Sequence, residues 1–116
     1  MTSAPAKIRV SKDRADFIFV SQDGDEFVLP AEMLRVLSPS AEVQGHSPEQ
    51  RKIVGGKKDI QIEAVAPVGN YAVRIVFSDG HDTGIFTWEY LRELDADRSE
   101  RWSTYLAELK ERGLSR

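Results

Sequence analysis

Residues 60–88 contain three short segments in which apolar and polar side chains alternate, and this pattern constrains the fold more than any other feature of the chain. The alternation has the two-residue period of a strand that is buried on one face. Tight-turn sequences separate the segments at Pro67–Asn70 and at Asp79-Gly80. The first two segments carry Ile60, Ile62, Ala64, Tyr71, Val73, Ile75 and Phe77, and residues 83–88 form the third. Three strands joined by short turns predict an antiparallel meander.

A second group of strands is predicted before residue 30. Residues 7–11 alternate, and two β-rich runs, 17–20 and 26–29, flank a turn sequence typical of a hairpin. A short helix is predicted over residues 30–37, because proline suits a first helical turn and Pro39 ends the segment. From residue 38 to 59 there are few apolar anchors and several glycines and prolines, so we expect a long loop.

Two helices are predicted at the C-terminal end. Thr87 is placed to cap a helix over residues 88–94, and Asp97 and Glu100 have the spacing of a capping box for the next one. That second helix carries an apolar stripe and ends at Gly113. The stripe consists of Trp102, Tyr105, Leu106 and Leu109. Such a stripe commonly docks onto the domain's own sheet, but a terminal helix could also exchange or dimerise with a second chain.

These segments together predict an α+β fold. We expect an antiparallel, curved β-meander sheet of about five to six strands, short helices, and the C-terminal amphipathic helix packed along the sheet. Residues 1–6 are small and polar and are expected to be disordered. At 116 residues the chain has the length of one domain.

Composition excludes several classes of function. The chain has 0 cysteines, which rules out disulfides, thiolate metal sites and a thiol nucleophile. Its net charge of −3 argues against general nucleic-acid binding. No run of apolar residues is long enough to span a membrane, and the first residues lack the pattern of a secretory signal, so we expect a cytoplasmic protein without a membrane partner.

One turn gathers side chains that could hold a metal ion. Asp79, His81 and Asp82 lie within four positions, and carboxylate with imidazole is a common donor set for iron or zinc. The same residues are also ordinary for a hairpin turn. His46, three residues before Glu49, could add a second imidazole, although a solvated loop histidine is the simpler interpretation.

A basic, glycine-containing stretch is a second candidate site. Arg51, Lys52, Lys57 and Lys58 surround Gly55-Gly56, and such a loop could bind an anion through backbone N–H groups and side-chain charge. The stretch lacks the phosphate-loop pattern, so a solvated charged loop is the alternative. The chain also has no Gly-x-Ser-x-Gly or Gly-x-Gly-x-x-Gly motif.

Two stretches carry a resemblance to a known family. They are Leu34-Arg35-Val36-Leu37-Ser38-Pro39-Ser40-Ala41-Glu42-Val43 and the segment from Val68-Gly69-Asn70-Tyr71-Ala72 through Ser78-Asp79-Gly80-His81 to Trp88-Glu89-Tyr90-Leu91. They resemble the gamma-butyrobetaine hydroxylase-like N-terminal domain, a small domain of unknown function. The resemblance implies a domain over residues 7–95 and leaves residues 96–116 as a C-terminal helical extension.

The resemblance also implies what this member lacks. Zinc-bearing members use a Leu-Arg-x-x-Cys-Pro-Cys-x-x-Cys pattern together with the histidine of the Asp-Gly-His turn. In this chain Ser38, Ser40 and Val43 stand at the cysteine positions, and His81 is the one ligand type retained. Serine is a poor zinc ligand and valine has no ligating atom, so we expect this member to have no zinc and no other cofactor.

The resemblance further implies an accessory function. Domains of this family occur alone, before a 2-oxoglutarate-dependent oxygenase domain, or beside iron–sulfur carrier ATPases of the Mrp/ApbC type. Catalysis belongs to the separate oxygenase domain. We therefore expect a protein-interaction domain that is not an enzyme and that is linked to iron–sulfur assembly or to an oxygenase partner. The alternative is a protein that binds iron or zinc through His81, Asp79 and Asp82.

Overall fold

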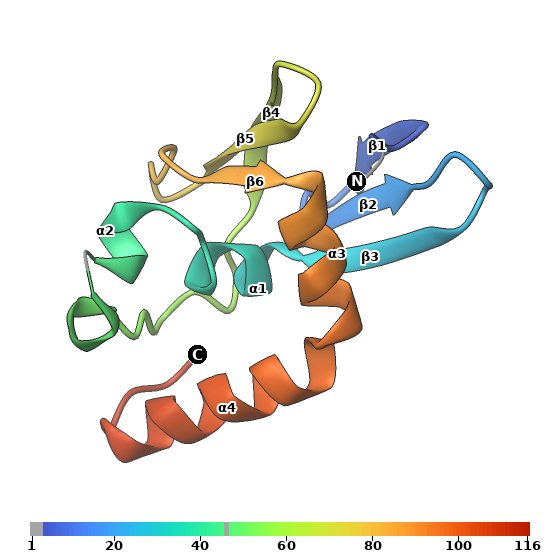
Figure 1. Ribbon diagram of the computed structural model, residues 1–116. Helices are drawn as coiled ribbons and strands as arrows, with labels where there is room; N and C mark the ends of the chain where they lie inside the picture. Colours follow the sequence, from blue (N-terminus) through green and yellow to red (C-terminus); the bar gives the residue numbers. More distant parts are fainter. Residues whose placement is uncertain (1–3, 46) are drawn as a thin grey trace.

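The structure, a computed structural model, describes residues 4–45 and 47–116. Six strands and four α-helices follow one another along the chain (Figure 1). The strands are β1 (Lys7–Val10), β2 (Asp16–Val20), β3 (Glu26–Pro30), β4 (Ile62–Val68), β5 (Ala72–Phe77) and β6 (Ile85–Thr87). The helices are α1 (Ala31–Val36), α2 (Ala41–Gln44), α3 (Trp88–Ala96) and α4 (Arg98–Glu111), and η1 (Pro48–Gln50) is a 3₁₀ turn.

The strands form two antiparallel meanders, each of three strands. One sheet has the order β1-β2-β3 and the other the order β4-β5-β6. The α+β class and the antiparallel strands are confirmed, but the strands are divided between two sheets instead of forming the one sheet expected. The long stretch between β3 and β4 separates the two meanders, and Arg14 joins them by donating from its guanidinium to the carbonyls of Ile62 and Glu63.

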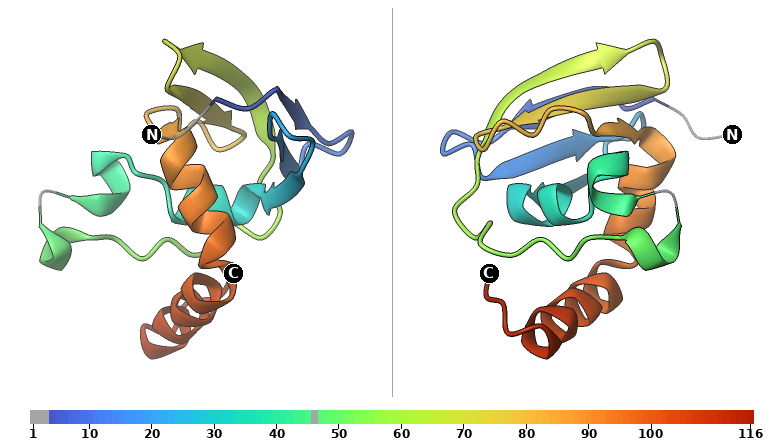
Figure 2. Two further views of the ribbon diagram at one scale, coloured as in Figure 1. Left: turned by 45° about the vertical axis from the view of Figure 1, so that its right-hand side comes forward. Right: turned by 90° about the vertical axis from the view of Figure 1, so that its left-hand side faces the viewer.

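The core lies between the sheets and the helices α1 and α3. Alternate residues of β2 and β5 are completely buried, as the two-residue period requires. The largest fully buried side chains include Phe17, Phe19, Leu29, Leu34, Ile62, Ile75, Phe77, Phe86, Leu91 and Leu94. Figure 2 shows the helices on one side of the β4–β5–β6 sheet, so its other face has no helix against it.

Residues 38–59 are more structured than the sequence predicts. Ser40 caps the four-residue helix α2 by accepting a hydrogen bond from the N–H of Glu42. Farther along, Lys52 donates its N–H to the Val43 carbonyl. A helix of one turn has no intrinsic stability, so it depends on tertiary contacts that local patterns do not show. The prediction of a long loop missed α2 and η1 for this reason, although most of the stretch lies outside helices and strands.

The two C-terminal helices form where the sequence predicts them. Thr87 caps α3 by accepting from the N–H of Tyr90, whereas Asp97 makes no side-chain cap bond to α4. The stripe of α4 does not lie along a sheet as expected. Tyr105 and Leu109 are buried against Val36, with Trp102 and three residues of other segments around them, namely Leu37, Ile53 and Val54.

At the N-terminus, residues 1–3 of the segment expected to be disordered lie outside the described residues. Ala4 packs against the main core and Ala6 donates its N–H to the Val20 carbonyl, so residues 4–6 follow the sheet. No described helix combines the length and the apolar character that crossing a membrane requires.

Candidate functional site

The turn between β5 and β6 holds His81 in place. Gly80 has a φ of +90°, a conformation in which an L side chain is strained, and its N–H donates to the carbonyl of Phe77. The backbone of His81 bonds back to β5 through its carbonyl, which accepts from the Phe77 N–H at 2.9 Å. Its own N–H donates to Oδ1 of Asp79 at 3.0 Å. The imidazole is thereby directed away from solvent, and the residue is only 6% exposed.

Both ring nitrogens of His81 have protein partners. Nε2 lies 2.9 Å from Oγ of Ser38, and Nδ1 lies 3.0 Å from Oε2 of Glu42. A carboxylate oxygen accepts, so Nδ1 donates to Glu42; in the tautomer with its proton on Nδ1, Nε2 accepts from the Ser38 hydroxyl. Oγ of Ser38 in turn accepts from the N–H of Ser40. The result is a chain of hydrogen bonds that runs from Glu42 of α2, whose side chain is largely exposed, through the buried His81 ring to the buried Ser38 just after α1.

The four positions matched to zinc ligands by resemblance come together in the fold. Ser38 is completely buried, Val43 is buried in α2, and Oγ of Ser40 lies 2.6 Å from Oγ1 of Thr83. Two hydroxyls and an isopropyl group do not fit zinc, which prefers thiolate, imidazole and carboxylate. Hydrogen bonds between side chains therefore occupy the place where the resemblance puts a metal centre.

The predicted set of His81, Asp79 and Asp82 is not assembled as a metal centre. Asp79 lies close to the backbone of His81, but its Oδ2 is 2.8 Å from Nε of Arg35 and 2.7 Å from Nζ of Lys57. Asp82 is exposed and pairs with Arg74. Residues 4–45 and 47–116 contain no group of three or more His, Cys, Asp or Glu side chains that could hold a metal ion. His46 lies outside the described residues.

Charge pairing strongly affects the Asp79 carboxyl. Burial raises its pKa, but hydrogen bonds from Lys57, from the His81 N–H and from Arg35 outweigh burial and hold the pKa well below its ordinary value. The Asp79 carboxylate therefore links the β5–β6 turn to Arg35 of α1 and to Lys57.

The hydrogen-bond order Ser38, His81, Glu42 has the connectivity of a serine-hydrolase triad. However, the Ser38 side chain has no exposed surface, so a substrate cannot reach its oxygen. The hydrogen bonds of Ser38, His81 and Glu42 link the α1–α2 connection to the β5–β6 turn, and we call these three residues the buried relay. Sequence reasoning missed Glu42 as a member and Thr83 as the partner of Ser40, although Glu42 lies inside the first resembling stretch.

The basic residues expected to form an anion site do not converge. Arg51 pairs with Glu108 of α4, whereas Lys57 pairs with Asp79. The N–H of Gly56 donates to the carbonyl of Ser115 at 2.8 Å, so it is not directed at a ligand. Lys52 and Lys58 are exposed.

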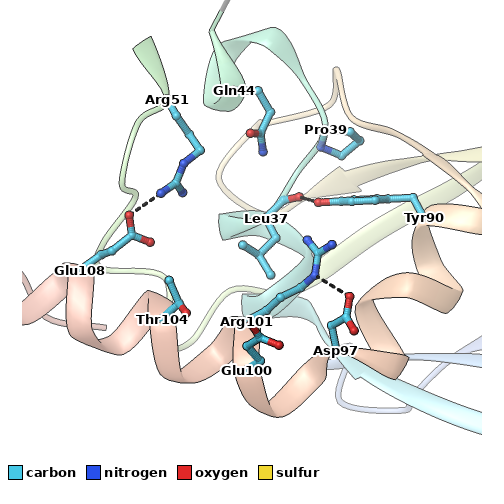
Figure 3. A pocket seen from close by; sticks show the side chains of 10 residues that line it. All are labelled: Leu37, Pro39, Gln44, Arg51, Tyr90, Asp97, Glu100, Arg101, Thr104 and Glu108. Atoms are coloured by element: carbon cyan, nitrogen blue, oxygen red, sulfur yellow. Dashed lines mark hydrogen bonds and ion pairs between the residues drawn. The ribbon is translucent and has the colours of Figure 1, made fainter. Parts of the chain in front are cut away.

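A polar pocket of about 580 Å³ lies between α4 and the α1–α2 connection (Figure 3). Tyr90 donates its hydroxyl to the carbonyl of Leu37 at its back. In the picture, Arg51 faces Glu108 on one side, and Arg101 faces Asp97 on the other. The two arginines are therefore balanced by acids within the protein, and the pocket has no net positive charge to attract an anion.

The face of the β4–β5–β6 sheet that has no helix against it carries several apolar side chains, most of them partly exposed, and we call it the outer sheet face. Strand register places its members opposite one another: Ala64 with Val76, Ala66 with Arg74, and Val68 with Ala72, which in turn faces Thr87, while Arg74 faces Ile85. Ile85 is 43% exposed, and Tyr71 at the adjoining turn is 57% exposed. A flat, mostly apolar face with an aromatic side chain at its edge has the character of a protein interface.

Gly84 tests the packing of the buried relay. A Cβ at this position would lie 2.6 Å from Oγ of Ser38 and 3.0 Å from Cε1 of Phe86. Gly84→Ala is expected to destabilise the fold by about 1–3 kcal/mol, since a well-packed core has no room for the added methyl group. Urea unfolding would measure this. Gly24→Ala is the comparison for backbone strain without crowding, because its φ is positive and no atom lies within 4 Å of its Cβ. An effect of Gly84→Ala below about 0.5 kcal/mol would contradict tight packing at Ser38.

Comparison with known proteins identifies the domain. Residues 8–92 match the family model described as gamma-butyrobetaine hydroxylase-like, N-terminal. Two solution structures determined by NMR are similar over 100% of this chain. One has 43% identity, a TM-score of 0.84 and 91% of its own chain covered. The other has 39% identity, a TM-score of 0.83 and 86% covered.

A crystal structure of a protein of unknown function from Acidithiobacillus ferrooxidans, assigned to the DUF971 family, is also similar. It shares 44% identity with a TM-score of 0.66, over 80% of this chain and 93% of that one. No curated protein matches the chain.

Proposed function

Because the chain belongs to the gamma-butyrobetaine hydroxylase-like N-terminal domain family, we propose that it is a non-catalytic accessory domain that binds a partner protein through the outer sheet face. The partner that we propose is a cytoplasmic iron–sulfur carrier ATPase of the Mrp/ApbC type. A 2-oxoglutarate oxygenase is the second candidate, because domains of the resembling family also precede such enzymes.

The exposure of the outer sheet face is the observation that carries the proposal. Ile85 of β6 is 43% exposed, and Tyr71 at the adjoining β4–β5 turn is 57% exposed. Arg74 pairs directly with Ile85 in the register, and its side chain is 43% exposed and lies 3.6 Å from Asp82. An apolar centre with an arginine–aspartate pair beside it can bury area and also select a partner by charge.

The buried relay supports the non-catalytic part of the proposal. The chain's one described histidine is enclosed, and the hydroxyl bonded to it has no exposed surface. Asp79 is neutralised by Arg35 and Lys57. The groups best suited to acid–base or nucleophilic chemistry are therefore engaged in holding the α1–α2 connection against the β5–β6 turn.

Binding measurements with an aspartate at Ile85 test the proposal. Calorimetry of the purified chain against the carrier of its own organism should give saturable binding, and Ile85→Asp should weaken it by about tenfold or more, as loss of an interface anchor does. Leu106→Asp is the matched control, because Leu106 is 39% exposed on α4, away from the sheet. The Leu106→Asp variant should bind the carrier with the same affinity as the unmodified chain.

Three outcomes count against the proposal. One is absence of binding to both the carrier and the oxygenase. Another is equal weakening by Ile85→Asp and Leu106→Asp, which would place the interface elsewhere. Turnover of a substrate by the isolated chain would overturn the non-catalytic assignment.

A further inference from the structure

The bend between α3 and α4 is not made by a helix-breaking residue. The sequence from Trp88 to Arg112 contains neither glycine nor proline. Asp97 lies between the helices with φ −101° and ψ 16°, close to the helical region. Helical hydrogen bonds continue on both sides, from the Asp97 N–H to Glu93 and from the Arg101 N–H to Asp97. A sharp bend normally has a proline, a glycine or an inserted group as its cause, so here tertiary contacts must hold it.

Those contacts form a narrow seam between the C-terminal segment and the rest of the domain. The seam's apolar part is Tyr105 and Leu109 against Val36, with Ile53 and Val54 alongside. Pockets of about 580 and 540 Å³ lie beside α4, so the helix is only partly covered by the domain. Near its start, Arg98 also donates to the Val28 carbonyl and Trp102 packs against the main core.

Polar contacts complete the seam and are specific to this segment. Tyr105 donates its hydroxyl to the Val54 carbonyl, and Glu108 pairs with Arg51. Arg116 makes two hydrogen bonds to the buried carboxylate of Glu32, at 2.7 and 3.0 Å. The Ser115 carbonyl accepts from Gly56. The surface that contacts α4 therefore has an acceptor or an opposite charge for each of Tyr105, Glu108 and Arg116.

We infer that α4 exchanges between two copies of the chain. Straightening at Asp97 joins α3 and α4 into one helix and carries α4 away from its own domain. The apolar stripe of α4 is then exposed unless it packs against a second copy of the chain. That copy has the same contact surface, on which Arg51 can pair with Glu108 and Glu32 can pair with Arg116. The exchange is reciprocal, so both copies keep every seam contact, as in domain swapping.

The balance between the two forms depends on concentration. The swapped dimer has the same seam contacts as the monomer and gains a regular helix at residue 97. It loses the translational freedom of one chain, so dilute protein is monomeric and concentrated protein dimeric. This inference does not depend on the proposed function, because it concerns α4 and not the outer sheet face.

The bend provides a direct experiment on the full chain. Light scattering after size exclusion, from micromolar to millimolar concentration, should show a dimer that increases with concentration. Asp97→Ala should lower the dissociation constant of the dimer roughly tenfold, because alanine favours a continuous helix at residue 97 in each of the two chains. Insertion of Gly-Ser-Gly after Asp97 should give a monomer throughout, since a long flexible connection lets α4 fold back. Glu111→Ala, an exposed change at the far end of α4, is the control for helix propensity and should leave the equilibrium unchanged.

An isotope-filtered NMR experiment identifies the interface. Labelled and unlabelled chains are unfolded, mixed in equal amounts and refolded at high concentration. Exchange predicts contacts between the Tyr105 ring of one chain and the Val36 methyls of the other. A chain that stays monomeric even as Asp97→Ala, or a dimer in which those contacts are all within one chain, would overturn the inference.

Discussion

The triple variant Ser38→Cys, Ser40→Cys, Val43→Cys is expected to bind one zinc ion per chain, whereas residues 4–45 and 47–116 of the unmodified chain contain no group of three or more side chains suited to a metal ion. The fold already brings residue 38 to His81, whose Nε2 lies 2.9 Å from Oγ of Ser38, and residue 40 is hydrogen-bonded to that same oxygen, with buried residue 43 one helical turn farther along in α2. A thiolate and an imidazole bind zinc at about 2.3 and 2.1 Å, so a small outward shift makes room for the ion. Glu42 already holds Nδ1, which is the carboxylate–histidine pairing that orients a zinc-bound imidazole.

Zinc should stabilise this variant substantially. An ion that binds only the folded chain adds about 4 kcal/mol when its free concentration is a thousandfold above Kd. Elemental analysis of protein made without a histidine tag measures the stoichiometry, and thermal unfolding with and without a chelator measures the stabilisation. The control adds His81→Ala to the triple variant and should lose most of both effects. Less than about a tenth of an equivalent of zinc in the triple variant would contradict the expected geometry.

Asp79→Asn is expected to destabilise the fold by about 2–4 kcal/mol at pH 7, since it removes the carboxylate that neutralises two partly buried cations. Arg35 would be affected most, because its Nη1 is already buried without a hydrogen-bond partner among the described residues. Asp82→Asn is the matched control. Its carboxylate is exposed and pairs with an exposed Arg74, so the loss should be small.

The effect of Asp79→Asn should depend on pH in a defined direction. The pKa of Asp79 is lowered from 3.8 in the folded chain, so its contribution is fully present above pH 3.8. That contribution is lost progressively as the pH falls from there through the folded-state pKa. Urea unfolding at pH 7, 5 and 3 should therefore show a constant gap between the two proteins at the higher values and a smaller gap at pH 3. A gap that does not change below pH 3.8 would mean that Asp79 acts through its shape and not its charge.

The two meanders and the C-terminal helices could be predicted because their patterns are local. Val73, Ile75 and Phe77 alternate with polar or half-buried neighbours, and this period alone identifies a strand with one buried face. Helix α2 could not be predicted, because one turn with a serine cap is stable only where Val43 finds the core. The division of the strands between two sheets could not be predicted either, because alternation of apolar and polar residues does not show which strand pairs with which.

The candidate site could be predicted in part. The resemblance pointed to Ser38, Ser40, Val43 and His81, and the fold places them together. Asp82 was grouped with His81 on spacing, yet its exposed side chain lies with Arg74 while the His81 ring is buried, because residues 81–84 form an irregular turn whose side-chain directions no periodic pattern reveals. Glu42 carries no signal by itself, since an acidic residue in a short helix is ordinary on any exposed surface.

What the sequence by itself determined is the local conformation and the chemistry that is absent. Zero cysteines exclude thiolate ligands whatever the fold, and the two-residue and helical periods define strands and helices before any contact forms. Only the tertiary structure decided the partners of the polar groups. Ser38 and His81 are 43 residues apart, and Asp79 lies 44 residues from Arg35. The period of a pattern states which side of an element is buried, but a hydrogen bond or ion pair needs two groups within about 3 Å, and only the folded chain brings them there.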